Sequence, residues 1–310
     1  MKAVILCPGQ GAQRVGMGKD LAERFPAARD IFGSIDDALG MKLSALMWNG
    51  PEADLILTHN AQPAILAHSL AVAAVVGATL APAAGAGHSL GEYSAYTVAR
   101  SLAAADGASL VRRRGELMLE AGERRAGAMA AVLGLATDLV VLACREASIG
   151  HEVAVAANIN TPDQTVISGD PSAVQRAGEK ARAAGAKRVT PLKVSGAFHS
   201  PLMAPAQAGL RAALAAVTFR DPAFPIIANA SAEPVRDAAG ARKLLDQQLV
   251  APVRWVECMR RAADLAGQDA TFVEIGPGTV LAGLLKRIVP EAKAVSLGTA
   301  EEVSKFLEAA

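Results

Sequence analysis

The chain has 310 residues, which is enough for one large domain or for a large and a small one. Its formal net charge is +1, so we expect neither a nucleic-acid surface nor a membrane surface. No uninterrupted apolar stretch of about twenty residues is typical of a membrane span, and we expect no signal peptide. The 3 cysteines are far apart and lack the spacing of metal ligands, which indicates a reducing cytoplasm and no metal site.

The first 126 residues predict an alternation of strands and helices. We expect strands at residues 2–7 and 80–86. We expect helices at residues 18–25, 27–39, 62–76, 92–99 and 102–121. A glycine-rich loop at 8–13 follows the first strand, and Ser101 is placed to cap the last of these helices.

Residues 127–194 have a different order of elements. Strands are expected at 128–133, 153–159, 164–168 and 187–194, and helices at 137–148 and 171–184. An Asn-Thr-Pro-Asp turn joins the second strand to the third. The order β-α-β-β-α-β is the ferredoxin-like pattern, so we predict a small inserted domain over 127–194.

Beyond residue 195 the chain returns to alternating strands and helices. Strands are expected at 224–228, 270–275 and 292–297, and helices at 202–216, 238–250, 254–266 and 279–288. The simplest interpretation is an α/β domain with a parallel sheet, formed by residues 1–126 and 195–310 and interrupted by the small domain.

The pentapeptide Gly87-His88-Ser89-Leu90-Gly91 fits G-x-S-x-G, the nucleophile elbow. It lies between a predicted strand and a predicted helix, in the order that this turn requires. The turn would expose the Ser89 hydroxyl and aim the Leu90 amide at a substrate carbonyl. The alternative is a glycine-rich turn that only links two packed elements.

A serine nucleophile needs a base, which is most often a histidine. Among the 5 histidines, His199 stands in a loop of small residues between a strand and a helix, and such loops carry catalytic residues. The other four are more simply explained as loop, turn or packing residues: His59, His68, His88 and His151. No Asp or Glu lies close to His199 in the sequence, so the group that orients its ring is either a distant acid or a backbone carbonyl.

Several short blocks spread over nearly the whole chain add to the elbow. They are residues 8–13 (PGQGAQ), 60–64 (NAQPA), 87–93 (GHSLGEY), 113–118 (RRGELM), 158–162 (NINTP), 196–200 (GAFHS), 248–255 (QLVAPVRW) and 274–278 (EIGPG). Together they resemble the malonyl-CoA:acyl-carrier-protein transacylases of fatty acid and polyketide synthesis. Cys7 and Ala12 depart from the usual Phe and Ser of the first block, beside the expected oxyanion loop. The resemblance implies an α/β-hydrolase-like large domain with a ferredoxin-like insertion.

The resemblance also implies catalytic roles. Ser89 would be the acylated nucleophile and His199 its base, with the backbone carbonyl of Gln248 orienting the ring. The backbone amides of Gln10 and Leu90 would form the oxyanion hole.

Further residues would bind the substrate. Arg114 would bind the free carboxylate of the malonyl group, because a guanidinium holds a carboxylate through two hydrogen bonds. The alternative for Arg114 is a solvated helix arginine. Gln62 would support the floor of the site, and Asn160 belongs to the same expected set. Phe198 would fill the space that an α-methyl branch of the substrate needs.

The implied activity is a ping-pong transfer of malonyl from malonyl-CoA to acyl carrier protein through a malonyl-Ser89 ester. No metal or redox cofactor is expected, and the enzyme is expected to be a cytoplasmic monomer. Three alternatives stay open at this point. They are a trans-acting acyltransferase of a polyketide synthase, an acyl-thioester hydrolase that uses the same serine, and a non-catalytic subunit that docks a carrier protein.

Overall fold

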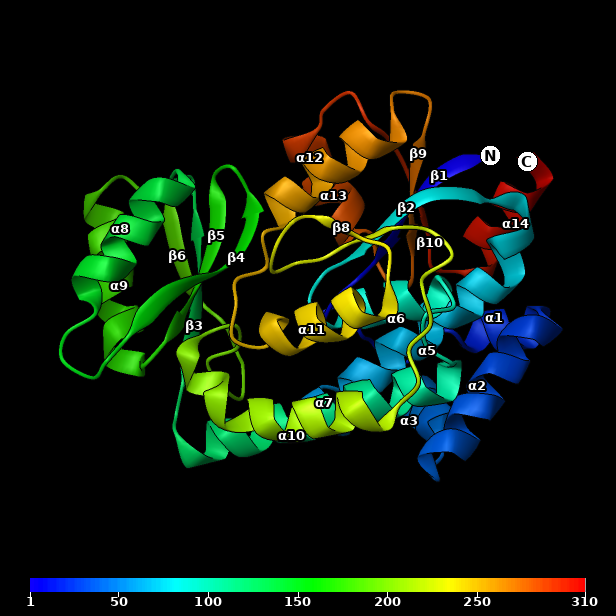
Figure 1. Cartoon of the computed structure of the whole chain (residues 1–310), viewed down its shortest axis with the longest axis horizontal. Helices are drawn as coiled ribbons and strands as arrows, with labels where there is room; N and C mark the ends of the chain where they lie inside the picture. The colour runs from blue at the N-terminus through cyan, green and yellow to red at the C-terminus, as the bar shows by residue number, and fades with distance from the viewer. Residues whose placement is uncertain (310) are drawn as a thin grey trace.

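A six-stranded sheet with the order β10-β9-β1-β2-β7-β8 lies at the centre of the larger part of the molecule (Figure 1). The computed structural model describes residues 1–309; Ala310, the last residue of the predicted catalytic domain, lies outside the described residues. The strands are β1 (Lys2–Cys7), β2 (Ala81–Gly87), β7 (Ile226–Ile227), β8 (Pro234–Val235), β9 (Thr271–Ile275) and β10 (Lys293–Leu297). Neighbouring strands are parallel from β10 to β7, and β8 is antiparallel to β7.

Residues of β1 alternate between two hydrophobic clusters, one on each face of the sheet. Ala3, Ile5 and Cys7 belong to one cluster, whereas Val4 and Leu6 belong to the other. A parallel strand that is covered on both faces reads as a continuous apolar run, which explains why β1 was predictable from its sequence.

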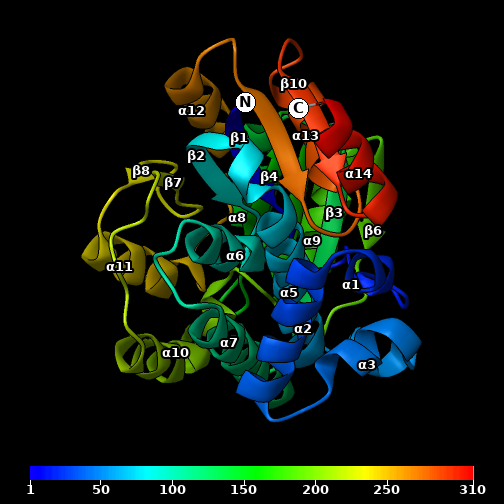
Figure 2. The same ribbon diagram turned by 90° about the vertical axis from the view of Figure 1, so that its right-hand side faces the viewer.

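Helices cover both faces of this sheet (Figures 1 and 2). In chain order they are α1 (Lys19–Arg24), α2 (Pro26–Leu39), α3 (Leu43–Asn49), α4 (Glu52–Leu55), α5 (Thr58–Val76), α6 (Leu90–Val98), α7 (Ala104–Arg124), α10 (Ala204–Ala216), α11 (Ala238–Gln248), α12 (Trp255–Ala266), α13 (Val280–Ile288) and α14 (Ala300–Ala309), with short 3-10 turns at Gly77–Thr79 and Pro201–Met203. Among the described residues, one segment, Thr58–Thr79, is long and apolar enough to cross a membrane. Of its most apolar stretch, 72% is buried inside the protein, as in the core helix of a folded domain.

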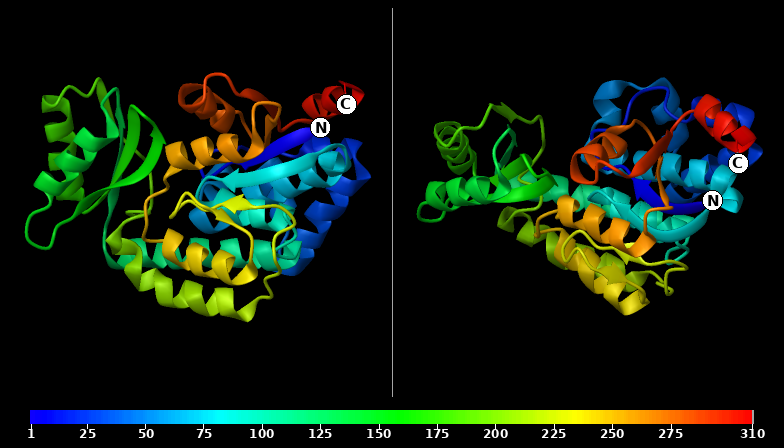
Figure 3. Two further views of the ribbon diagram at one scale, coloured as in Figure 1. Left: turned by 45° about the horizontal axis from the view of Figure 1, so that its top comes forward. Right: turned by 90° about the horizontal axis from the view of Figure 1, so that it is seen from above.

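A separate four-stranded antiparallel sheet lies at the left of Figure 1, away from the two termini. Its strands are β3 (Ala128–Leu133), β4 (Ala154–Thr161), β5 (Gln164–Gly169) and β6 (Arg188–Pro191), in the order β4-β5-β3-β6. The helices α8 (Thr137–Ala147) and α9 (Pro171–Ala183) share a hydrophobic cluster with the sheet. This connectivity is ferredoxin-like, so the predicted fold class is confirmed. Seen from above, this small part projects from the body (Figure 3).

Two chain segments that connect the parts run side by side. A Cβ on Gly122 would lie 2.0 Å from the Ser195 carbonyl oxygen, and one on Gly127 would lie 2.3 Å from the Ala197 nitrogen. A larger residue at either position would therefore push the segments apart.

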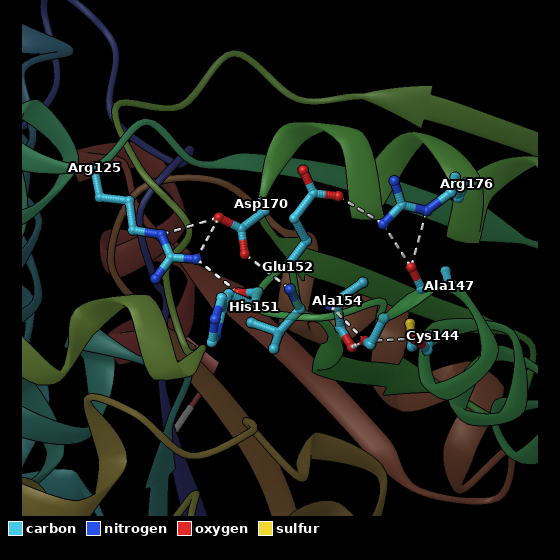
Figure 4. Close-up of polar contacts among 10 residues, drawn as sticks. Arg125, Cys144, Ala147, His151, Glu152, Ala154, Asp170 and Arg176 are labelled. Atoms are coloured by element: carbon cyan, nitrogen blue, oxygen red, sulfur yellow. Dashed lines mark hydrogen bonds and ion pairs between the residues drawn. The ribbon is translucent and has the colours of Figure 1, made fainter.

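An ion pair also joins the two parts (Figure 4). At the end of α7, Arg125 donates two hydrogen bonds to Asp170 Oδ1, at 3.0 and 2.7 Å, and one to the His151 carbonyl at 3.1 Å. The other carboxylate oxygen of Asp170 accepts from the Val153 amide at 2.8 Å. The carboxylate thus ties α7 to the chain that enters β4.

Several local predictions were wrong. Ser101 does not cap α7: the helix begins after Ala103, and the Ser101 hydroxyl donates to the Arg220 carbonyl at 2.6 Å. The strand expected at 224–228 is only the two-residue β7. The turn expected at Asn160 is shorter, because β4 continues to Thr161. The helices α3, α4 and α14, the strand β8 and the 3-10 turn at Gly77–Thr79 were not predicted.

Candidate active site

Ser89 lies between β2 and α6 with φ 53°, a backbone conformation that residues other than glycine rarely adopt. The glycines around it permit this turn. A Cβ on Gly87 would lie 1.9 Å from the carbonyl carbon of Gly91, and a Cβ on Gly91 would lie 2.1 Å from the Cys7 carbonyl oxygen. The pentapeptide therefore forms the predicted elbow, and the turn packs directly on the end of β1.

The hydroxyl of Ser89 faces a histidine from a distant part of the chain. Ser89 Oγ lies 2.7 Å from His199 Nε2, and His199 Nδ1 lies 3.0 Å from the Gln248 carbonyl oxygen and 3.2 Å from the Ala251 carbonyl oxygen. A carbonyl can only accept a hydrogen bond, so Nδ1 carries the proton and the lone pair of Nε2 faces the serine. Backbone carbonyls, and not an acid, thus contact the outer ring nitrogen.

The ring of His199 is buried and lies near a cation. Burial, followed by the charge of Arg114, lowers the pKa of His199 to about 3. The imidazole is therefore neutral at physiological pH and is able to accept a proton from the serine.

Arg114 is a buried cation at the same point. It lies on α7 and is 1% exposed. It donates to Gln62 Oε1 at 2.8 Å from Nη1, and to Ser89 Oγ at 3.0 Å and Gln248 Oε1 at 3.1 Å from Nη2. Its guanidinium carbon also lies 5.5 Å from the centroid of the Tyr93 ring.

The hydrogen-bond acceptors of Arg114 within residues 1–309 are neutral oxygens, not carboxylates. Burial lowers the pKa of Arg114 from its ordinary value, because the cation has lost its water. A buried guanidinium whose direct contacts are all neutral is suited to receive an anionic group beside Ser89.

Close packing of α7 on α5 brings Arg114 to this position. A Cβ on the adjacent Gly115 would lie 2.6 Å from the Cα of His59, so glycine lets the two helices approach. The alternative of a solvated helix arginine is therefore wrong for Arg114, although it fits its half-exposed neighbour Arg113.

Two backbone amides, one in the elbow and one in the loop that packs on it, have no acceptor within the described residues. They belong to Gln10 and Leu90. The loop of Gln10 packs on the elbow, because a Cβ on Gly9 would lie 2.6 Å from the His88 carbonyl oxygen. The side chain of Gln10 donates to Thr58 Oγ1 at 3.2 Å. Both amides are thus free to donate to a developing oxyanion.

The remaining predicted residues, Gln62, Asn160 and Phe198, make no hydrogen bond to Ser89 within the described residues. Gln62 is buried and contacts Arg114 directly. Asn160 lies on β4 of the small sheet, and its Oδ1 accepts a hydrogen bond from His88 Nε2 at 2.9 Å. It therefore contacts His88, the residue before Ser89 in the elbow. Phe198 is 7% exposed and belongs to the main hydrophobic cluster.

Sequence reasoning did not assign any role to Glu92 or Asn229. The amide of Ser89 donates to Asn229 Oδ1 at 2.8 Å, and Glu92 Oε2 accepts from the Asn229 amide at 2.9 Å. Burial raises the pKa of Glu92 to about 7. The available signal for Glu92 was that it is the only charged residue of α6 and stands in the first turn of that helix. Asn229 follows the end of β7, where polar residues of parallel sheets gather around sites.

The other titratable side chains give no sign of a metal site. Within residues 1–309, no group of three or more His, Cys, Asp or Glu side chains is placed to hold a metal ion. Cys7, Cys144 and Cys258 are buried as free thiols. His68 is a packing residue, as expected, with Nε2 2.9 Å from the Gly298 carbonyl oxygen.

The chain is similar in sequence and in fold to known acyltransferases. The family model of the acyl transferase domain matches residues 4–307 of this chain. A malonyl CoA-acyl carrier protein transacylase from Bacillus subtilis (strain 168) is 42% identical over 308 residues, which cover 99% of this chain and 96% of the relative. An acyl carrier protein S-malonyltransferase structure from Vibrio cholerae superposes with a TM-score of 0.94 at 40% identity, covering 98% of this chain and 99% of that one. A malonyl-transacylase in complex with a type II PKS acyl-carrier protein superposes with a TM-score of 0.94 at 39% identity, covering 100% of this chain and 99% of that one.

The fold, together with the elbow serine, its histidine and the buried arginine, defines the class of this protein as an acyltransferase. Within that class, the chain belongs to the family of malonyl-CoA–acyl carrier protein transacylases.

Proposed function

We propose that this chain transfers the malonyl group from malonyl-CoA to the phosphopantetheine thiol of acyl carrier protein, through a malonyl-Ser89 ester. The single observation that carries this proposal is the Arg114 guanidinium, 3.0 Å from Ser89 Oγ and in contact with neutral acceptors. A malonyl thioester has a free carboxylate at the far end of the acyl group, and an acetyl thioester has none. The relatives named above act as malonyl transferases, which supports the same substrate for this chain.

In the first half-reaction, His199 Nε2 takes the proton of Ser89 Oγ as the oxygen attacks the thioester carbonyl. The amides of Gln10 and Leu90 donate to the oxyanion. The carbon–sulfur bond then breaks, and the thiol of coenzyme A leaves with the proton that His199 holds. The carbonyls of Gln248 and Ala251 stabilise the imidazolium between these two steps.

The second half-reaction reverses the roles. His199 takes the proton of the phosphopantetheine thiol, and the sulfur attacks the ester carbonyl of malonyl-Ser89. The ester bond breaks, and Ser89 recovers the proton from His199. Both the leaving group and the acceptor are thiols, so one base serves both directions and the proposed reaction uses no metal or redox cofactor.

Gln62, Asn160 and Phe198 complete the proposed substrate site. Gln62 holds Arg114 in place through the 2.8 Å contact with Nη1. Asn160 fixes the elbow through His88 from the small sheet. Phe198 precedes the histidine and would limit branching at the α-carbon of the acyl group.

The organisation of the whole protein is part of the proposal. Residues 1–126 and 195–310 would form the catalytic domain and 127–194 the inserted domain. We place the enzyme in the cytoplasm as a monomer; three buried free thiols are consistent with a reducing compartment.

Incubation with labelled malonyl-CoA, with and without acyl carrier protein, tests the proposal. A malonyl adduct on Ser89 that passes to the carrier thiol supports it. Release of free malonate at the same rate without the carrier would instead identify an acyl-thioester hydrolase. A carrier from fatty acid synthesis and one from a type II polyketide synthase, compared in the same assay, identify the pathway.

A further inference from the structure

Glu92 is a fully buried carboxyl that the mechanism above does not use. It lies three residues after Ser89 in the first turn of α6 and is 0% exposed. A carboxyl group is costly to bury, and its burial calls for a specific set of partners.

The partners of Glu92 are two residues that touch the catalytic pair. Its Oε2 accepts from Gln248 Nε2 at 2.8 Å and from the Asn229 amide at 2.9 Å. Within residues 1–309, its Oε1 has no hydrogen-bond partner. One oxygen therefore connects the end of α11 and the segment after β7 to the helix that follows the nucleophile.

Gln248 holds the base and the serine at once. Its backbone carbonyl accepts from His199 Nδ1 at 3.0 Å, and its Nε2 also donates to the Ser89 carbonyl at 2.9 Å. Two contacts determine which end of the Gln248 side-chain amide is oxygen and which is nitrogen. Arg114 can only donate, so it faces Oε1, and Glu92 Oε2 accepts from Nε2.

Asn229 holds the elbow from the other side. Its Oδ1 accepts from the Ser89 amide at 2.8 Å and its Nδ2 donates to the Gly87 carbonyl at 2.8 Å. Ser89 has an unfavourable positive φ, so the turn persists only where such contacts hold it.

We infer that Glu92 is a positioning residue for acyl transfer, whose Oε2 holds Gln248 and Asn229 so that Ser89 and His199 stay at hydrogen-bond distance. The inference rests on the proposed function. Glu92 acts by accepting hydrogen bonds through Oε2. A proton, or the amide nitrogen of a glutamine, can occupy the Oε1 position without breaking either bond. Glutamine therefore preserves the function, and a side chain without an acceptor removes it.

The test compares Glu92→Gln, Glu92→Ala and Glu92→Leu with the wild type, by the single-turnover rate of Ser89 acylation per active site. Leucine fills the space, so it serves where the alanine variant fails to fold. A misplacement of reacting groups by about 1 Å can cost on the order of 10²-fold in rate, and we expect a loss of that order in the leucine and alanine variants. Glu92→Gln should keep most of the wild-type rate. Acetyl-CoA should lose rate as well as malonyl-CoA, because Ser89 and His199 serve both.

A double-mutant cycle with Gln248→Leu shows whether Glu92 acts through that side chain. If it does, Glu92→Leu costs much less rate in the Gln248→Leu background than in the wild type. The matched control is Glu274→Gln, a second buried glutamate, which lies on β9 and accepts from the Leu281 and Ala282 amides and from the Ser296 hydroxyl, and not from Gln248 or Asn229. It should lower the melting temperature and leave the acylation rate unchanged.

Wild-type acylation by Glu92→Leu, or a Glu92→Gln variant as slow as Glu92→Leu, would overturn the inference. A wild-type enzyme that forms no adduct on Ser89 from malonyl-CoA would instead overturn the proposed function.

Discussion

Arg114 Nη2 lies 3.0 Å from Ser89 Oγ, so the buried cation donates a hydrogen bond to the oxygen expected to carry the acyl group. In the same structure that oxygen lies 2.7 Å from His199 Nε2. The cation and the base converge on one atom, and this geometry ties the choice of substrate to the chemical step.

Ser89→Ala should abolish acylation by malonyl-CoA and leave the fold intact, because a smaller side chain adds no clash at the elbow. Intact-mass analysis of the wild type after mixing with malonyl-CoA should show one malonyl adduct, located on Ser89 by peptide mapping. An adduct on one of the three buried cysteines would contradict the assignment.

Arg114→Ala should change the substrate preference instead of removing all activity. Loss of one partner of a desolvated charge pair costs roughly 2–5 kcal/mol, and only an acyl group with a free carboxylate feels this loss. Malonyl transfer should therefore fall steeply while acetyl transfer holds or rises, as measured by kcat/KM for both thioesters. Arg113→Ala is the matched control on the same helix, since its side chain is 45% exposed and pairs with Glu116 and Glu120. Equal losses of malonyl and acetyl transfer in Arg114→Ala would show that Arg114 only supports the structure.

The rate of acylation should not fall as the pH drops through 6.5, the ordinary pKa of a histidine. Burial and Arg114 hold the pKa of His199 at about 3, so the free base persists as the pH falls below 6.5. The folded-state pKa lies below the unfolded one. The stability that neutral His199 contributes is therefore present above pH 6.5 and is lost as the pH falls toward 3. The measurement is kcat/KM for acetyl-CoA against pH, because this quantity reports the free enzyme.

Arg114→Ala should move the acid limb of that profile to higher pH, because it removes the cation that lowers the pKa of His199. The titratable groups near the ring are Arg114 from α7 and His88 from the elbow, and burial lowers the pKa of His88 as well. Glu92, whose pKa is raised to about 7, would titrate within the pH range that the profiles cover, so both profiles are measured in the Glu92→Gln background. An acid limb that stays in place would show that Arg114 does not act on the base.

Phe198→Ser should narrow the preference for malonyl-CoA over methylmalonyl-CoA, mainly by improving methylmalonyl transfer. One methyl group is worth about 1–3 kcal/mol in such a pocket, or roughly 10- to 200-fold in kcat/KM. Phe198 is also part of the main hydrophobic cluster, so its removal should lower the melting temperature. If kcat/KM falls for both thioesters and their ratio stays constant, the ring only packs the loop and the preference arises elsewhere.

The sequence by itself determined the features that depend on neighbouring residues. The apolar run of β1, the glycines of the elbow and the β-α-β-β-α-β order are local patterns, and the structure agrees with them. The short helices α3 and α4 escaped prediction, because so few residues carry no clear period and form a helix only when they are packed.

Only the tertiary structure decided what surrounds the serine. His199 is 110 positions from Ser89, and Gln248 is 159 positions from it. The order of strands in the sheet, and not any local pattern, brings their segments to one edge. The choice between an acid and a carbonyl for His199, the hydrogen bonds of Glu92 and the failure of Ser101 to cap α7 all depend on such long-range contacts. Hydrogen bonds form with whichever donor or acceptor the packed fold places within about 3 Å, and spacing along the sequence does not specify that distance.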